Sequence, residues 1–368
     1  MAAEKIAIGL LIALIAAIEI ALSFDIWLDS GSDYCEKLQE SSNGFQDFLM
    51  WVTQHLTYLF AALMMLAIIL EYNYLVGLEL AFIYTIVNVI ESLMKASIGY
   101  PRPYWIDSNV EGFSCSEGFG DPSGHSMMVV AIFPYAVYRT TNNYLYYVPV
   151  AIFDILVLHY RMYGGYHSYS QVVLGTLIGG YILYIAISYF NYLNFYIEST
   201  KKIWGFASVI AFCFIVMMAA VLLYAYREVY WEDEWSDNIE ANCNRIDGED
   251  AKVNTLFGTF TVFFWLGAVS AYWYSDYMRL KDNSIKIWER VLRILIVFGA
   301  YEGFYFLMAI DYGALSVKAF MNIVLSYLQG FLCCGGIPLL WAIGKGIKPS
   351  ENSPQDPESA GMLNTEKD

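Results

Sequence analysis

The sequence is poor in charged residues and in cysteine. Only 15% of its 368 residues are Asp, Glu, Lys or Arg, while 58% are hydrophobic; soluble domains carry about 25% charged residues. This composition excludes an ordinary water-soluble protein. Six cysteines in a chain of this length are too few for a disulfide scaffold. Lys and Arg, 20 together, are outnumbered by 36 Asp and Glu, which argues against nucleic-acid binding because that requires clustered basic side chains.

What the sequence does contain is a series of long apolar runs. The hydrocarbon core of a bilayer takes about 20 apolar residues as a helix, and the runs are predicted to be helices because irregular backbone cannot face lipid. We identify ten runs, at 6–24, 48–70, 75–94, 125–139, 146–160, 169–190, 203–226, 255–275, 290–310 and 319–344. The sequence therefore predicts an all-α, polytopic membrane bundle of nine or ten transmembrane helices.

The two ends of the chain differ in character. The run 6–24 follows Lys5 and is rich in small residues, so it is either a cleaved signal peptide or a retained helix; Glu19 within it favours a retained helix. Residues 348–368 contain three prolines and no apolar run, which predicts a disordered tail. We therefore expect one transmembrane domain, 1–347, followed by this tail.

The loop charges predict the orientation. If the helices alternate, most loop lysines and arginines fall on the side that also holds the tail, and the positive-inside tendency places that side in the cytosol. The opposite side carries the acidic loops 25–47 and 227–252 and the cysteines Cys35, Cys115 and Cys243. Loop cysteines confined to the non-cytosolic side suit an oxidising compartment. One disulfide among them is compatible with the sequence, but its pairing cannot be deduced.

Three segments stand out at the edges of the apolar runs. They are Lys95-Ala-Ser-Ile-Gly-Tyr-Pro-Arg102-Pro103-Tyr104-Trp105, Cys115-Ser-Glu-Gly-Phe-Gly-Asp-Pro122-Ser123-Gly124-His125 and His159-Tyr160-Arg161-Met-Tyr-Gly-Gly-Tyr-His167-Ser-Tyr-Ser-Gln171. The first two share one loop, and the two helices predicted at 125–139 and 146–160 return the chain to the same side. Basic side chains and two of the four histidines are therefore expected to converge at one membrane face.

The residue types in these segments suit a phosphate ester. Lys95, Arg102 and Arg161 can surround a dianion and the charge that spreads over its oxygens during transfer, with the arginines as bidentate donors. Ser123 and Gly124 open a helix whose free N–H groups and dipole favour an anion; the hydroxyl adds a donor and the glycine lets the backbone approach closely. A neutral imidazole can attack phosphorus and a protonated one can donate to the leaving oxygen, which divides the hydrolysis into two steps.

The three segments together resemble a known family. The patterns Lys-x6-Arg-Pro, Pro-Ser-Gly-His and Arg-x5-His, in this order within residues 95–171, are similar to those of the type 2 phosphatidic acid phosphatase superfamily, which also includes vanadium haloperoxidases. The Arg-Pro-Tyr-Trp sequence, the approach to Pro-Ser-Gly-His and the Gln four residues after the last His look most like the glucose-6-phosphatase branch. The nine runs that follow residue 48 also match that branch.

The resemblance implies a role for each matching residue. His167 would be the nucleophile that becomes phosphohistidine, and His125 would be the general acid for the leaving alcohol. The phosphoryl group would be held by Lys95, Arg102, Ser123, Gly124 and Arg161. No metal and no cofactor is expected, and the sequence has no cluster of Asp, Glu and His with ligand spacing.

Two positions depart from the superfamily pattern. Tyr160 stands where the superfamily usually has Ser, and Gln171 stands where it usually has an Asp that orients the nucleophilic imidazole and stabilises its cation. The Gln carbonyl can accept the same bond but brings no charge. We interpret Gln171 as an orienting residue typical of the glucose-6-phosphatase branch, while a lowered rate or lost activity is the alternative.

Other polar residues in or beside the apolar runs are interpreted as structural. His55 and His159 lie outside the motif register. Intramembrane acids are candidates for function, but interhelical hydrogen bonding is the favoured interpretation for Asp154, Glu302, Glu79 and Glu91. Tyr104 and Trp105 are equally compatible with lining a leaving-group pocket and with a structural role.

These observations predict a phosphoric monoester hydrolase in a bilayer, with its site facing the lumen or the exterior. The favoured substrate is a glucose-6-phosphate-like or related small phosphate ester, with a lipid phosphate as the alternative. A non-catalytic membrane subunit that retains the fold is the rival interpretation, and haloperoxidase-like activity is disfavoured because those enzymes are mostly soluble. The endoplasmic reticulum is favoured over the plasma membrane and the vacuole, and the oligomeric state is left open.

Overall fold

The fold is entirely helical throughout the part of the chain that can be described. The computed structural model describes residues 26–40, 43–241, 243–273, 286–308, 310 and 313–344, and every regular element in these ranges is a helix. The apolar run predicted at 6–24 and the tail predicted at 348–368 lie outside the described residues. The all-helical fold expected from the sequence is therefore confirmed for the described ranges.

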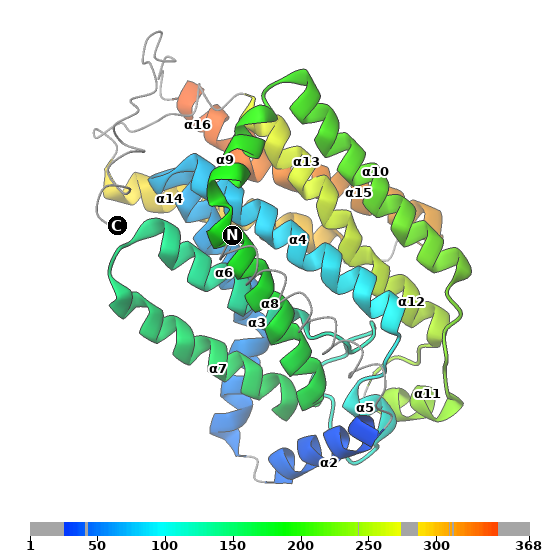
Figure 1. The fold of residues 1–368 in the computed structure, drawn as a ribbon. Coiled ribbons are helices and arrows are strands. Elements are labelled where there is room, and N and C mark those ends of the chain that lie inside the picture. The colour runs from blue at the N-terminus through cyan, green and yellow to red at the C-terminus, as the bar shows by residue number, and fades with distance from the viewer. Residues whose placement is uncertain are drawn as a thin grey trace, which may run out of the picture.

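The helices follow one another with short connections (Figure 1). In chain order they are α2 (Ile26–Glu40), α3 (Gly44–Ala67) with η1 (Ile68–Tyr72), α4 (Tyr74–Ile98), α5 (Pro103–Ile106), α6 (Gly124–Thr140), η2 (Tyr144–Tyr146), α7 (Tyr147–Tyr163), α8 (Tyr169–Ser188), α9 (Phe190–Ser199), α10 (Ile203–Tyr226), α11 (Asp233–Glu240), α12 (Gly248–Leu256), η3 (Phe257–Phe260), α13 (Thr261–Tyr272), α14 (Ile287–Met308), α15 (Leu315–Phe331), η5 (Leu332–Gly336) and α16 (Ile337–Gly344).

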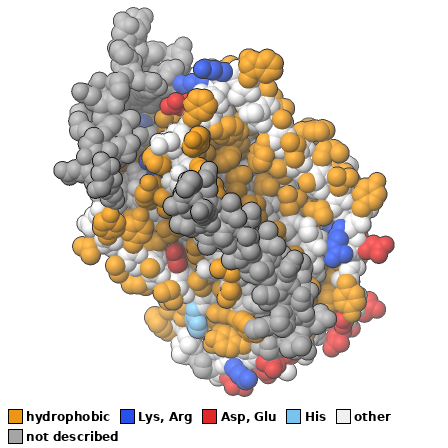
Figure 2. Space-filling model, viewed as in Figure 1, with side chains coloured by type: hydrophobic (Ala, Val, Ile, Leu, Met, Phe, Trp, Pro, Cys, Tyr) orange, Lys and Arg blue, Asp and Glu red, His pale blue; other side chains and the backbone are white. Residues whose placement is uncertain are grey.

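Eight helical segments of the described chain are long and apolar enough to cross a membrane. They are Gly44–Tyr72, Tyr74–Ile106, Tyr144–Tyr163, Tyr169–Ser188, Ile203–Tyr226, Gly248–Tyr272, Ile287–Met308 and Leu315–Trp341. The run predicted at 125–139 corresponds to α6, which has 17 residues and is not among the eight. The predicted count of nine or ten is therefore not confirmed. Figure 2 shows apolar side chains over most of one face, with charged side chains mainly at its two ends.

Local sequence explains where the helices that frame the site begin and end. Asn43 and Asn73 each accept hydrogen bonds from two backbone N–H groups in the first turns of α3 and α4, which is the usual role of Asn at a helix N-cap. Ser168 and Gln171 form a capping box at the start of α8. At its other end, α4 stops at Gly99, whose φ of 71° lies in the left-handed region that glycine tolerates best.

Buried ion pairs fix the end of the bundle opposite to α5. Glu79, at the start of α4, accepts hydrogen bonds from Tyr135 Oη (2.7 Å) and Arg139 Nε (2.6 Å) near the end of α6. Its carboxylate is fully buried, so these charged bonds hold α4 and α6 together. The interhelical bonding expected for Glu79 is confirmed. By contrast, Asp154 Oδ1 is buried without a hydrogen-bond partner among the described residues.

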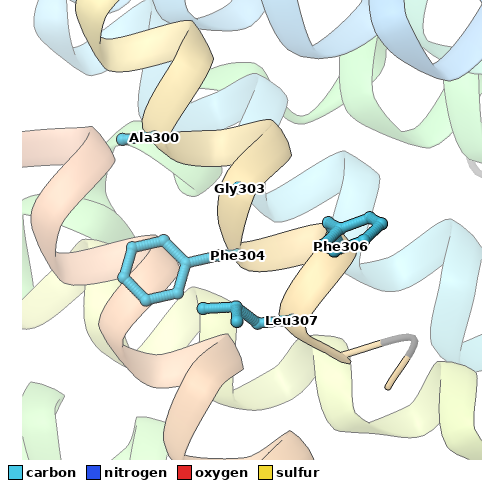
Figure 3. A pocket seen from close by; sticks show the side chains of 5 residues that line it. All are labelled: Ala300, Gly303, Phe304, Phe306 and Leu307. Carbon is cyan, nitrogen blue, oxygen red and sulfur yellow. The ribbon is translucent and has the colours of Figure 1, made fainter.

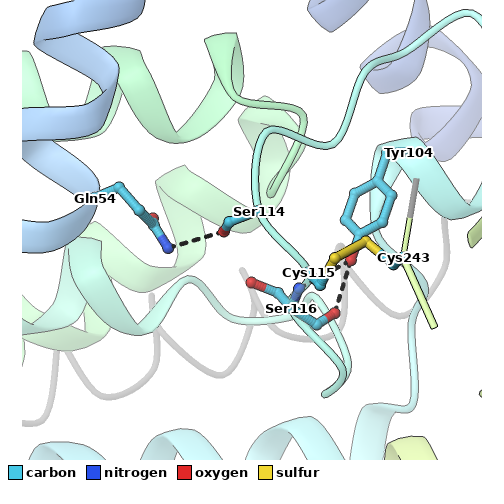
Figure 4. The surroundings of a disulfide bond; sticks show 6 residues. All are labelled: Gln54, Tyr104, Ser114, Cys115, Ser116 and Cys243. Atoms are coloured by element: carbon cyan, nitrogen blue, oxygen red, sulfur yellow. Dashed lines mark hydrogen bonds between the residues drawn. A yellow bond between two sulfur atoms is a disulfide. The ribbon is translucent and has the colours of Figure 1, made fainter.

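A disulfide crosses the loops on the α5 side. Cys115, in the loop before α6, is bonded to Cys243, between α11 and α12, and their Cα atoms are 5.5 Å apart. Figure 4 shows this bond beside Tyr104, whose hydroxyl donates to the carbonyl of Ser116 (2.8 Å). Of the three loop cysteines, Cys35 stays a buried free thiol. The disulfide joins the segment that carries the second motif to the connection between α11 and α12.

Candidate active site

The three motif segments meet at one end of the bundle. The first motif spans the last turn of α4 and α5, the second ends at the start of α6, and the third covers the end of α7 and the start of α8. This is the end that carries α2, α5 and α11, at the bottom of Figure 1. Because α6 leads away from it and α7 leads back, the two crossings expected from the sequence bring the segments together.

Arg102 joins all three segments through backbone carbonyls. Its guanidinium donates from Nε to Gly118 O (2.7 Å) and from NH2 to Phe119 O (3.2 Å), both in the approach to the second motif. It also donates from NH1 to Tyr166 O (3.1 Å), one residue before His167. The side chain is buried. Arg102 therefore fixes the loop around the site in addition to placing a positive charge there.

Arg161 lies in the last turn of α7 and points into the protein. NH1 donates to Gln54 Oε1 on α3, and the guanidinium stacks over the Tyr166 ring, 4.3 Å from its centroid. Nε is buried without a hydrogen-bond partner among the described residues. An unsatisfied donor on a buried guanidinium is costly, so this N–H is available to an anion that enters the site.

Gln54 was not among the predicted site residues, yet it contacts several of them. In addition to Arg161, its backbone carbonyl lies 3.4 Å from His125 Nε2. Its side-chain amide donates to Ser114 Oγ (3.2 Å), as Figure 4 shows. The sequence signal for it is weak: one amide inside the apolar run 48–70. Gln54 ties α3 to both the second and the third motif.

His125 and Ser123 stand at the first turn of α6. The ring of His125 meets Tyr58 of α3 edge-on, with ring centroids 4.6 Å apart. Ser123 is the N-cap residue; its N–H donates to the Gln171 carbonyl (3.1 Å) and its Oγ accepts from Ser126 Oγ (2.9 Å). These contacts place the start of α6 directly against the start of α8.

His167 occupies the tight connection between α7 and α8. Its backbone N–H donates to Arg161 O (3.3 Å), and its carbonyl accepts from the Cys35 thiol of α2 (3.6 Å). The imidazole is buried, and Nδ1 has no hydrogen-bond partner among the described residues. The ring is therefore held from its backbone and keeps at least one nitrogen uncommitted.

The electrostatic surroundings keep the His167 imidazole neutral. Burial lowers its pKa well below the usual value of 6.5, because the charged form loses its hydration. Nearby positive charges and a second imidazole lower the pKa further; these are Arg161, Arg102, Lys95 and His125. A neutral imidazole near pH 7 is the form that can act as a nucleophile.

Gln171 supports the loop and does not contact the His167 ring. Its Oε1 accepts from the backbone N–H of Ser168 (3.2 Å), and its Nε2 donates to Pro101 O (2.9 Å). The carbonyl that was expected to orient the imidazole is therefore engaged with the residue next to it. In this geometry Gln171 positions His167 through the backbone and links the third motif to the first.

The other aromatic and histidine residues considered in the sequence analysis make structural contacts. Tyr104 and Trp105 are buried in an apolar cluster with α11, where Trp105 stacks near Trp231, so their structural role is favoured. His55 and His159 make aromatic contacts with Trp51 and Tyr160 respectively.

Most of the predicted site residues are buried. The predicted phosphate ligands and nucleophile have exposed fractions of 7% or less: Lys95 7%, Arg102 5%, Ser123 0%, Arg161 2% and His167 1%. His125, by contrast, is partly exposed. A cavity of about 610 Å³ borders the first motif at Tyr100 and Pro101 and is otherwise lined largely by the 227–235 segment. A second hollow, of about 400 Å³, is lined by apolar residues of α14 (Figure 3). Neither of these two includes His125 or His167.

Asp121, just before the Pro-Ser-Gly-His turn, was not predicted as a functional residue. Its carboxyl is buried, and Oδ1 has no hydrogen-bond partner among the described residues. Burial raises its pKa from 3.8 to about 7, against the opposing effect of the Lys95 charge. Because the folded pKa exceeds the unfolded one, the stability that this group contributes is fully present below about pH 3.8 and is lost as the pH rises through about 7.

Removing the Asp121 charge is therefore expected to stabilise the protein increasingly as the pH rises. Asp121→Asn should melt at the same temperature as the wild type at or below about pH 3.8 and at a higher temperature near pH 8, because only the wild type loses stability through a buried carboxyl as the pH rises. The measurement is intrinsic tryptophan fluorescence during heating in detergent. Glu111→Gln, which neutralises an exposed acid of the same loop, is the control. A difference between the wild type and Asp121→Asn that does not change with pH would contradict the assignment.

Comparison with known proteins agrees with the location of these residues. A family model described as the PAP2 superfamily matches residues 76–195. This range, 120 of the 368 residues, contains all three motif segments and helices α6 to α8. No curated protein and no solved structure matches the chain.

Proposed function

We propose that this protein is a membrane phosphatase that hydrolyses a phosphate monoester at the site formed by the three motifs. The observation that carries the proposal is that three buried cationic side chains and the buried imidazole of His167 lie together with the partly exposed His125 at one end of a helical membrane bundle. The match to the PAP2 superfamily over residues 76–195 supports the same class of reaction, because the superfamily generally contains phosphatases.

Binding of the phosphate group follows from the charges. Lys95, Arg102 and Arg161 provide three positive charges for a dianion, and the free Nε–H of Arg161 is a donor for one of its oxygens. Ser123 adds its hydroxyl, and Gly124 begins the first turn of α6, where free N–H groups and the helix dipole favour negative charge. Preorganised donors of this kind stabilise the charge that spreads over the phosphoryl oxygens in the transition state.

The chemistry proceeds in two steps. In the first, the neutral imidazole of His167 attacks phosphorus and the P–O bond to the alcohol breaks. The imidazole of His125 takes up a proton when the phosphate dianion binds, because the dianion offsets the neighbouring positive charges of Arg161, Lys95 and Arg102, and it gives this proton to the leaving oxygen. In the second, water attacks the phosphohistidine, His125 accepts a proton from that water, and the P–N bond breaks to release inorganic phosphate. Covalent catalysis divides one difficult displacement into two easier ones.

The orientation and substrate class are part of the proposal. We place the site on the lumenal or extracellular side; the disulfide on that side supports an oxidising compartment, and among membranes we favour the endoplasmic reticulum. The loops and the short helices α2, α5 and α11 lie at the site end of the bundle (Figure 1). The cavity beside Pro101 borders the first motif and is lined in part by the charged residues Arg227 and Glu232; as its occupant we favour a small hydrophilic ester such as a sugar phosphate over a lipid phosphate.

Purified full-length protein in detergent is expected to release inorganic phosphate from glucose-6-phosphate faster than from phosphatidate. Vanadate, which imitates the transferring phosphoryl group, should inhibit the reaction because the same donors bind it. Colorimetric phosphate release with each substrate is the measurement, and heat-denatured protein is the control. A faster reaction with phosphatidate would replace the sugar phosphate by a lipid substrate. No release from either ester by folded protein would leave the non-catalytic membrane subunit as the better interpretation.

A further inference from the structure

One acidic side chain lies among the basic groups of the site. Glu91 is on α4, one turn before Lys95, and its Oε1 accepts a hydrogen bond from Lys95 Nζ at 2.7 Å. The carboxylate also interacts electrostatically with Arg102 and with Arg161. A negative charge in a site proposed to bind a phosphate dianion requires an explanation, because it neutralises part of the field that attracts the substrate.

The position of the Glu91 carboxylate is the more informative observation. It lies against Gly124, the first residue of α6, so closely that a Cβ added to that glycine would overlap its carboxyl carbon and both oxygens. Glu91 therefore occupies the space beside the first residue of α6 where a side chain of that residue would lie, and it also accepts a hydrogen bond from the lysine of the first motif. Lys95 and the start of α6 are two of the groups that we propose bind the phosphoryl oxygens.

The interhelical interpretation of Glu91 is replaced by a different one. Its hydrogen bond is to Lys95 on the same helix, and the contact across the bundle is with a glycine that has no side-chain donor. An i, i+4 ion pair stabilises an exposed helix only weakly, so helix stability does not explain an acid placed inside a buried cationic site.

We infer that Glu91 is an internal competitor of the substrate phosphate: its carboxylate occupies the anion site of the empty protein and is displaced when the phosphoryl group binds. This inference rests on the proposed function. The contacts of Glu91 agree with it, because Lys95 and Gly124 are already in contact with an anion. When phosphate binds, Lys95 exchanges one anionic partner for another and never remains a buried charge without a partner, which would be costly.

The consequence for the reaction is weaker binding of both substrate and product phosphate. A ligand that binds only the open form has an apparent dissociation constant raised by the reciprocal of the fraction of open protein. Inorganic phosphate, the last product, faces the same competition, and the returning carboxylate assists its release. Glu91 thus lowers product inhibition at a cost in substrate affinity.

The test is the affinity for inorganic phosphate, measured by isothermal titration calorimetry on the full-length protein in detergent. Glu91→Gln keeps the size of the side chain and one acceptor oxygen but removes the charge. We expect it to bind phosphate about tenfold more tightly than the wild type, since opposite charges this close typically alter an equilibrium by a factor of 10 or more. Product inhibition by phosphate should become stronger by the same factor.

Two further variants sharpen the comparison. Glu91→Asp keeps the charge but draws it back from Gly124 by one methylene, so its affinity should lie between those of the wild type and Glu91→Gln. It also replaces Glu91→Gln if that variant does not elute as a single species on gel filtration. Glu111→Gln removes a negative charge from the exposed loop before α6 and should bind phosphate as the wild type does.

The outcomes separate this inference from the proposed function. Unchanged or weaker phosphate binding by Glu91→Gln, with binding by the wild type, would show that Glu91 serves to position Lys95 and would overturn the competitor role alone. If folded wild-type protein and every variant fail to bind phosphate, the anion site itself is refuted, and the proposed function is refuted with it.

Discussion

Replacing His167 by alanine is expected to abolish phosphate release, with a loss of about 10,000-fold or more in kcat, the scale seen when a catalytic nucleophile is removed. The structure supports this expectation because the imidazole is buried beside three basic residues and its Nδ1 is uncommitted. Without it, water would have to attack the phosphate ester directly, and the division of the reaction into two steps would be lost.

The covalent intermediate gives a second measurement for the same variant. Wild-type protein mixed with a ³²P-labelled substrate and quenched in alkali should retain label on the protein, whereas His167→Ala should retain none. His159→Ala is the matched control, since His159 lies on the preceding helix and contacts the ring of Tyr160; it should keep both label and turnover. Labelled His167→Ala protein would place the nucleophile elsewhere.

The convergence of the site was predictable from sequence because it depends on topology. Two apolar runs separate the second motif from the third, and any helical bundle must return the chain to the same face after two crossings. The prediction that Arg102, His125 and Arg161 lie at the same face therefore required no knowledge of side-chain geometry. Residues far apart in sequence were placed together by the bilayer, which restricts helices to two ends.

The contacts within the site were not predictable in the same way. Gln54 and Glu91 lie inside apolar helices and belong to no motif, so their partners depend on which face each helix turns toward its neighbours. Gln171 was expected to contact the imidazole because it stands where the superfamily that the sequence resembles usually has an Asp that orients the nucleophilic His. Its amide instead caps α8 at Ser168 and reaches Pro101, a choice that depends on the loop before α6.

The short helices within the loops were also not predicted from the sequence. The segments 25–47 and 227–252 were interpreted as acidic loops, yet they contain α2, α11 and the start of α12. These segments are polar in composition but contain a few buried apolar residues. Trp235 and Ile239 of α11 belong to the buried cluster that contains Trp105. Short helices of this kind are stabilised by tertiary packing more than by their own propensity, so a reading of composition alone misses them.

Arg161→Lys is expected to lower kcat/KM by about 1,000-fold, although it preserves the charge. Arginine groups that stabilise phosphoryl-transfer transition states contribute about 10³ to 10⁵ in rate, and a lysine cannot reproduce the planar fork of donors. Here the guanidinium has two roles. Its NH1 donates a hydrogen bond to Gln54, while its unpartnered Nε–H is available to an entering anion. A single ammonium cannot fill both positions from the same backbone site.

The hydrogen bond between Arg161 and Gln54 can be tested by combining substitutions at the two residues. Gln54→Leu should lose part of the activity, because Arg161 would lose its acceptor and its fixed orientation; once Arg161 is already Lys, the second substitution should have little further effect. Such non-additivity is the sign of two residues that act as a unit. Arg245→Lys, in an exposed ion pair with Asp237, is the matched control and should keep wild-type kinetics. If Arg161→Lys stays within a few-fold of the wild type, Arg161 contributes charge alone, and the role of a directed guanidinium has to be given up.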